Sequence, residues 1–220
     1  MSNTPTEESF LKDVANHQME VIRDDGMYRH VRFRQPSSSC YLFDLITWPG
    51  YLCYVGDMGS YVFSRLPDMF QFFRTDRKNR HLKDGQTLGI NLGYWAEKVQ
   101  AMDKNDGINE FDEDKFNRVI VERTVNWIRE RREETTKDDR RELWEAVMSQ
   151  VVGADGDSGG YRKKAAAYDF YYQVNSKGKF QFDDLWESNF DRYTYRFVWC
   201  CYALAWGILQ YDNAKEAVAC

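Results

Sequence analysis

The chain has 220 residues, of which 43% are hydrophobic and 16% aromatic, and only four are prolines. This composition excludes intrinsic disorder over most of the length and supplies enough apolar side chains for one domain or two small ones. With 30 Lys and Arg against 35 Asp and Glu, the net charge of -5 gives no overall attraction to nucleic acid.

The cysteines are odd in number and form no C-x-x-C pair; they are Cys40, Cys53, Cys200, Cys201 and Cys220. We therefore expect reduced thiols rather than a disulfide framework or a zinc site. The first 20 residues are polar and acidic, without the apolar core of a signal peptide. The most apolar run, 197–211, has 15 residues, whereas a membrane span needs about 20. We interpret this run as a buried helix.

After a short predicted helix at 9–18, the region 19–63 predicts an antiparallel meander of four or five strands. The Asp25-Gly26 pair lies between two extended runs, which is a strong hairpin signal. Trp48-Pro49-Gly50 joins the next two β-rich runs, and a GDMG turn leads into a last short run at 60–63.

The remainder is predicted to be mostly helical. Pro67 is placed in the first turn of a predicted helix at 66–76, where proline is tolerated. Asp112 opens a long helix in which apolar residues recur at helical spacing and acidic residues fill the first turn. The full set of predicted later elements is helices at 93–102, 112–134, 137–152, 162–174 and 197–211, and a short strand at 178–184.

These elements predict an α+β fold, in which an N-terminal antiparallel meander packs against a mostly helical C-terminal part. A meander needs helices to cover its apolar face, so we expect a single domain over residues 1–220. Its sheet-rich half is 1–75 and its helical half 90–220, with the boundary in the polar, glycine-containing stretch 76–91.

The sequence GDSGG at 156–160 resembles the segment around the nucleophilic serine of chymotrypsin-like proteases. In that family a double β-barrel presents the serine to a histidine and an aspartate. Here Ser158 lies between two stretches of helical periodicity, and Tyr161 follows where the family has proline. We therefore interpret GDSGG as a connection between helices, and no catalytic residue is transferred.

Two other motifs also fail on spacing. The acidic segment 103–114 is similar to a calcium-binding EF-hand loop, but counting from Asp103 places Gly107 at position 5 and Ile108 at position 6, where the loop needs its glycine. We expect an acidic loop in which Asp112 or Asp114 caps the following helix, and no metal site. The loop 153–164 lacks the G-x-x-x-x-G-K-[ST] and G-x-G-x-x-G patterns of phosphate cradles. No cofactor is predicted.

The strand at 27–34 carries the best candidate site. Alternation places Met27, Arg29, Val31 and Phe33 on one face, and Tyr28, His30, Arg32 and Arg34 on the other. The predicted binding residues are Tyr28, His30, Arg32, Arg34, Asp44, Trp48 and Asp57. In an enzyme, His30 would be the acid or base, the arginines would hold an anion, and Asp44 and Asp57 would be the orienting carboxylates. The alternative is a solvated face on which Asp44 neutralises the cations across the strands.

Aromatic residues are dense at 168–172 and 186–199, and most of them are expected in the core. Tyr and Trp also anchor protein interfaces. Because a helix that is apolar on all sides is buried in its own fold or against a partner subunit, a homodimer through 197–209 is one possibility. In the run 129–142 basic and acidic residues are interspersed, so its net electrostatic field is small. We therefore do not expect it to bind nucleic acid.

The phrases FDLITWPGYL and GDMGSYVF carry a resemblance to the N-terminal half of uncharacterised proteins encoded by tailed bacteriophages and prophages, over residues 12–75. The resemblance implies a viral gene product that works in the bacterial cytoplasm, and it assigns no catalytic residue. By analogy with other small acidic phage proteins, we expect an interaction protein that inhibits a host protein, such as a defence component. The alternative is a small enzyme acting on a nucleotide or phosphorylated metabolite through His30, Arg32, Arg34 and Asp44.

Overall fold

The computed structural model describes residues 4–77, 86–104, 107–156, 159–176 and 178–219. It has the predicted α+β fold, with a six-stranded antiparallel meander in the N-terminal part and a mostly helical C-terminal part. The chain divides into two compact units. The first comprises residues up to 108 and again from 193, and the second comprises 109–192.

In its described residues, the first unit has one sheet and four helices. Its elements in chain order are α1 (Glu7–Asp13), β1 (Gln18–Asp25), β2 (Tyr28–Arg34), β3 (Phe43–Trp48), β4 (Tyr51–Gly56), β5 (Gly59–Ser64), α2 (Met69–Arg77), α3 (Leu92–Ala96), β6 (Val99–Met102) and α7 (Tyr195–Ala219). The strands follow one another in sequence order from β1 to β6, each antiparallel to the next. The predicted meander is therefore confirmed, with a sixth strand added.

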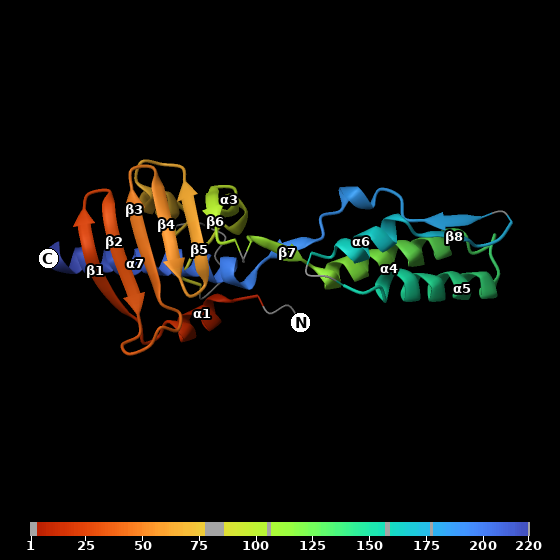
Figure 1. Ribbon diagram of the computed structural model, residues 1–220, viewed down its shortest axis with the longest axis horizontal. Helices are drawn as coiled ribbons and strands as arrows, with labels where there is room; N and C mark the ends of the chain where they lie inside the picture. Colours follow the sequence, from red (N-terminus) through yellow and green to blue (C-terminus); the bar gives the residue numbers. More distant parts are fainter. Residues whose placement is uncertain (1–3, 78–85, 105–106, 157–158, 177, 220) are drawn as a thin grey trace. The chain divides into compact units, whose positions relative to one another are not determined.

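Helix α7 covers one face of this sheet, running behind the strands so that its C-terminal end lies by β1 (Figure 1). The core forms between the two layers: Phe33 contacts Trp206, and Phe43 contacts Trp199 edge to face. Gly207 lets the helix approach closely, because a Cβ there would lie 3.0 Å from Leu45 Cδ1. Most apolar residues of α7 between Phe197 and Tyr211 are thus buried within the first unit, as expected for this run.

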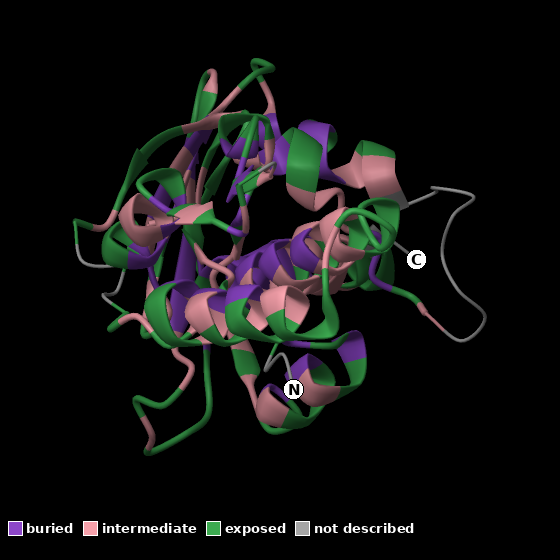
Figure 2. Cartoon of the chain, turned by 90° about the vertical axis from the view of Figure 1, so that its right-hand side faces the viewer, coloured by how far each residue is buried: buried purple, intermediate pink, exposed green. Residues whose placement is uncertain are grey.

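The second unit has its own core. Its elements are β7 (Asn109–Phe111), α4 (Glu113–Glu130), α5 (Lys137–Val147), a π-helical continuation η1 (Met148–Val152), α6 (Tyr161–Tyr168), β8 (Tyr171–Gln173), β9 (Lys179–Gln181), a 3₁₀ turn η2 (Leu185–Glu187) and β10 (Asp191–Tyr193). Phe116 and Ile120 from α4 pack in one cluster with Leu143 and Val147 from α5. Figure 2 shows buried positions on the inward sides of the elements and exposed positions on the outward sides.

Helix starts follow the capping signals. The Asp112 side chain accepts a hydrogen bond from the Lys115 backbone N–H at 2.9 Å, which confirms the predicted cap of α4. Thr136 and Asp139 form a reciprocal capping box at the start of α5.

Several boundaries differ from the prediction. The predicted helix at 93–102 ends at Ala96, and its second half is strand β6, because the edge of β5 offers it a pairing partner. The predicted helix at 162–174 ends at Tyr168, and β8 follows. Pro67 precedes α2 instead of lying in its first turn, since the helix begins at Met69. The two compact units also divide the chain elsewhere than the predicted boundary at 76–91, because α7 returns to the sheet.

Candidate functional site

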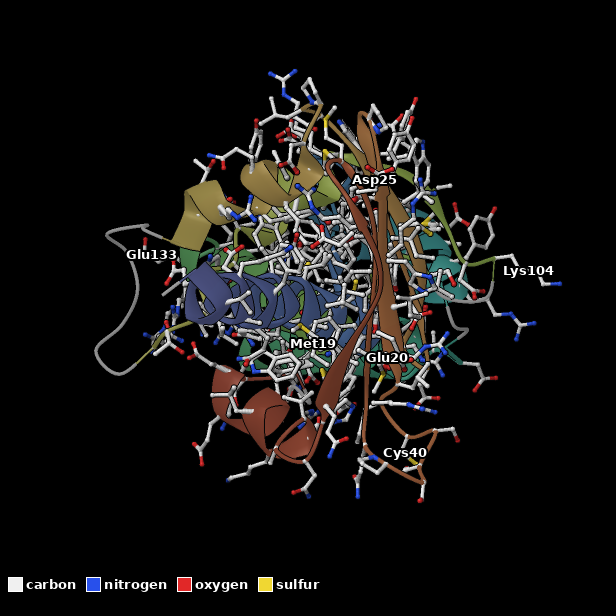
Figure 3. All side chains as sticks on the ribbon, turned by 90° about the vertical axis from the view of Figure 1, so that its left-hand side faces the viewer. Met19, Glu20, Asp25, Cys40, Lys104 and Glu133 are labelled. Carbon is white, nitrogen blue, oxygen red and sulfur yellow. The ribbon has the colours of Figure 1, made fainter. Side chains whose placement is uncertain are left out.

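The candidate residues of β2 lie on the face of the sheet opposite α7, here called the outer face. Val31 and Phe33 are fully buried under the helix, so strand alternation directs His30 and Arg32 to the other side. The register places Arg32 directly opposite Asp44 of β3 and His30 opposite Ile46. Among the described elements of the first unit, none lies over this face (Figures 1 and 3).

Asp44 is the centre of a closed polar cluster. Its two carboxylate oxygens accept hydrogen bonds from Arg32 Nε and Nη2, both at 2.9 Å, and Oδ2 lies 2.8 Å from His30 Nε2. Burial acts to raise the pKa of Asp44, but the hydrogen bonds and charges of Arg32 and His30 outweigh it and hold the pKa below its ordinary value. The pKa of Arg32 is raised, chiefly by its hydrogen bond to Asp44. The cross-strand neutralisation considered from the sequence is therefore present.

The other predicted residues do not join this cluster. Arg34 lies 3.9 Å from Glu20 on the neighbouring strand β1. Tyr28 is exposed and packs under the Arg23 guanidinium, whose carbon is 5.1 Å from the ring centroid. Asp57 accepts a hydrogen bond from the Tyr41 backbone N–H at 3.0 Å, which fixes a loop rather than a pocket.

Trp48 belongs to an apolar surface that sequence reasoning did not identify. Its ring stacks on Tyr51 with centroids 5.4 Å apart, and the register pairs the two residues across β3 and β4. The residues that share this part of the outer face are Ile46, Trp48, Tyr51, Val55 and Val62, here called the outer-face patch. Trp48, Tyr51 and Val55 keep 37%, 40% and 41% of their surface exposed. Alternation within LITWPGYLCYV was the available signal.

A second charged cluster lies on the side of the sheet that faces α7. Arg29 forms a bidentate ion pair with Asp68 at 2.8 and 3.1 Å, and its guanidinium lies over the Phe70 ring. Burial acts to raise the pKa of Asp68, yet the hydrogen bond and charge of Arg29 hold it below its ordinary value. Each of these polar groups has an opposite charge as its partner, so the cluster locks α2 onto β2.

The same cluster continues toward β1. The Tyr211 hydroxyl donates to Asp24 at 2.8 Å, and Lys215 pairs with the same carboxylate. Arg74 holds Asp212 through two hydrogen bonds, at 3.0 and 2.6 Å. Sequence reasoning missed these partners because they are far apart in the chain.

The loop that contains GDSGG has a structural role where it is described. Ser158 itself lies outside the described residues. Gly160 has a φ of +64°, and a Cβ there would overlap the Phe111 ring, so the position requires glycine. The Lys163 side chain, almost fully buried, binds the Val152 carbonyl and lies 3.0 Å from Glu113. These contacts tie α6 to α4 and to the end of η1.

Among the described residues, no group of three or more His, Cys, Asp or Glu side chains is placed to hold a metal ion. Within the same part of the chain, no helix is both long enough and apolar enough to cross a bilayer.

The fold and site define an α+β protein with an uncovered sheet face. Comparisons of the chain with protein-family models, with curated proteins and with solved structures found no match.

Proposed function

We propose that the chain is a bacteriophage-encoded interaction protein that works in the cytoplasm of the host bacterium, where it binds and inhibits a host protein such as an anti-phage defence component. We infer the binding role from the exposed aromatic and aliphatic side chains of the outer-face patch. The viral origin and the host context rest on the resemblance of residues 12–75 to tailed-phage proteins.

The outer-face patch has the chemistry of an interface centre. A sheet with a helix on only one side ordinarily presents polar residues to water on the other side. Here strands β3 and β4, which lie in the interior of the sheet, present Ile46, Trp48, Tyr51 and Val55 on that side instead. Trp and Tyr are the residues most enriched among those that dominate binding energy, because each buries a large area at a small cost in conformational entropy.

The charges beside the patch favour a protein partner with a mostly uncharged surface. Asp44 neutralises Arg32, and Glu20 lies near Arg34, so the rim has little net charge of either sign. Such a rim adds hydrogen bonding and excludes strongly charged competitors, while the apolar centre supplies the affinity.

The same pairing gives less support to an enzyme acting on a phosphorylated substrate. The Arg32 guanidinium directs its Nε and Nη2 donors at Asp44, so a phosphate that used this same pair of donors would have to displace that carboxylate. Replacing both Arg32 and Arg34 by alanine would not test the enzyme hypothesis cleanly. It would leave the mostly buried Asp44 without its main partner and could therefore lower stability as well as activity. Calorimetric titration with inorganic phosphate is a cleaner test, and we expect no saturable binding.

The experiment compares partner capture by three forms of the protein in phage-infected bacteria. Trp48→Ala with Tyr51→Ala removes the stacked pair, and Tyr161→Ala removes an aromatic side chain that is 76% exposed in the second unit. We expect wild type and Tyr161→Ala to retain one host protein in a fixed stoichiometry and to inhibit it when purified. The double variant should lose both properties at unchanged thermal stability. Equal capture by all three forms, or no retained partner, would contradict the proposal.

A further inference from the structure

We infer that strand β1 is the docking site for a second copy of this chain, which pairs with it antiparallel and extends the sheet across a two-fold axis. This surface is the edge of the sheet and is separate from the outer-face patch. Its occupant is identified by the shape and charge of β1 itself.

The β1 edge is long and open. Strand β1 is the first of the six strands, pairs only with β2, and has eight residues, which correspond to about 26 Å of backbone. Among the described residues, every position of β1 except the half-buried Met19 is exposed, and its backbone makes no backbone hydrogen bond to a segment other than β2. A long edge of this kind presents unpaired N–H and C=O groups that another strand can satisfy.

An apolar groove runs beside this edge on the α7 side. It has a volume of about 250 Å³, and its apolar lining comes from Met19, Val21, Ala214 and Val218. Val21 is 44% exposed and Val218 is 87% exposed, although both are β-branched and apolar. Figure 3 shows Met19 and Glu20 on opposite sides of β1, with Met19 toward the helix. A second copy related by a two-fold axis would bring its own Val21 and Val218 against these residues.

The charges of β1 are complementary to themselves. The register opposes Glu20 to Arg32 and Arg23 to His30, so the irregularity at Ile22 places Glu20 and Arg23 on the same outer face although they are three positions apart. In an antiparallel pair of β1 strands centred between Val21 and Ile22, Glu20 of each copy faces Arg23 of the other. The two-fold axis makes this contact twice. Opposite charges that face each other across strands stabilise the pairing, and like charges oppose it.

The test is a charge reversal and its reciprocal rescue, read as mass in solution. Wild type should give twice the chain mass of 26.1 kDa by light scattering at micromolar concentration. Glu20→Arg faces Arg23 of the second copy with a like charge twice, so its dissociation constant should rise by about tenfold or more. Adding Arg23→Glu restores complementary charges and should restore the dimer. Glu8→Arg, which breaks the exposed Glu8–Lys12 pair on α1, is the matched control and should remain dimeric.

Two further readouts keep the result unambiguous. Thermal unfolding of Glu20→Arg is measured beside the mass, because the register opposes residue 20 to Arg32 and the new arginine places a like charge across β1 and β2 within one chain. If that variant unfolds, the single variant Arg23→Glu decides, since it faces Glu20 of the second copy with a like charge and should weaken the dimer by a similar factor. Amide hydrogen exchange at 18–25 should slow as concentration rises. A monomeric wild type, a dimer that survives Glu20→Arg unchanged, or protection confined to other segments would overturn the inference.

Discussion

The substitution Gly207→Ala tests how closely α7 packs on the sheet. An added Cβ would lie 3.0 Å from Leu45 Cδ1 and 3.1 Å from Phe33 Cε2, against an ordinary carbon–carbon contact of about 3.5–4.0 Å. Leu45 and Phe33 are fully buried and cannot move into solvent. Overpacking of this kind costs about 1–3 kcal/mol, while replacing glycine inside a helix gains about 1 kcal/mol. We therefore expect the free energy of unfolding to fall by about 1 kcal/mol.

Urea unfolding followed by tryptophan fluorescence measures this change, and two variants isolate its cause. Asn213→Ala, at an exposed position of the same helix, changes only the helix propensity. It should raise the free energy of unfolding by about 0.5 kcal/mol. In a Leu45→Ala background the methyl of Gly207→Ala meets one neighbour fewer, so its penalty should shrink by about 1 kcal/mol. A gain of about 1 kcal/mol from Gly207→Ala in both backgrounds would refute the close approach of helix and sheet.

Two further predictions concern the sheet and its charges. Gly56→Ala should cost about 3 kcal/mol or more in urea unfolding, because its Cβ would lie 2.3 Å from the Leu42 carbonyl oxygen, a backbone atom. Gly26→Ala, with open space around it but a φ of +61°, should cost only about 1 kcal/mol; equal costs would contradict the steric argument. The pKa values of Asp44 and Asp68 are lowered in the folded state, so their stabilisation is complete above the ordinary aspartate pKa of about 3.9 and is lost as pH falls through the folded values. Asp44→Asn should therefore flatten the fall of the urea midpoint between pH 7 and pH 3, and an unchanged slope would show that Asp44 does not contribute.

The sheet could be predicted from the sequence because its signals are local. Asp25-Gly26 and Trp48-Pro49-Gly50 are turns between runs with a period of two, and β1 to β5 follow from them directly. Strand β6 has only four residues and its sequence, VQAM, has no strand periodicity; it is a strand because β5 supplies a partner, with Val62 opposite Ala101. The return of α7 to the sheet depends on tertiary packing, so the two compact units could not be located in advance.

The same distinction applies to the candidate site: pairs between consecutive strands could be predicted from the sequence, and pairs between distant segments could not. The pairing of Arg32 with Asp44 follows from alternation in two consecutive strands, and the structure places the two residues opposite each other. The Arg29–Asp68 pair could not be found this way, since the partners are 39 residues apart and Arg29 shares its face with Val31 and Phe33. A cation among inward-facing residues is itself a signal, because burying an arginine requires a carboxylate or an aromatic ring beside it.

The two proposals use different parts of one sheet and reinforce each other geometrically. A two-fold axis between paired β1 strands runs perpendicular to the sheet, so both outer faces point to the same side. The dimer would then present two outer-face patches in one continuous surface, with Trp48 and Tyr51 exposed in each copy. A partner that is itself dimeric would engage both patches, and the second contact would form at the high effective concentration set by the first. If both proposals hold, inhibition of such a partner depends on the β1 edge as well as the outer face, and Glu20→Arg should weaken it although this substitution changes none of the patch residues.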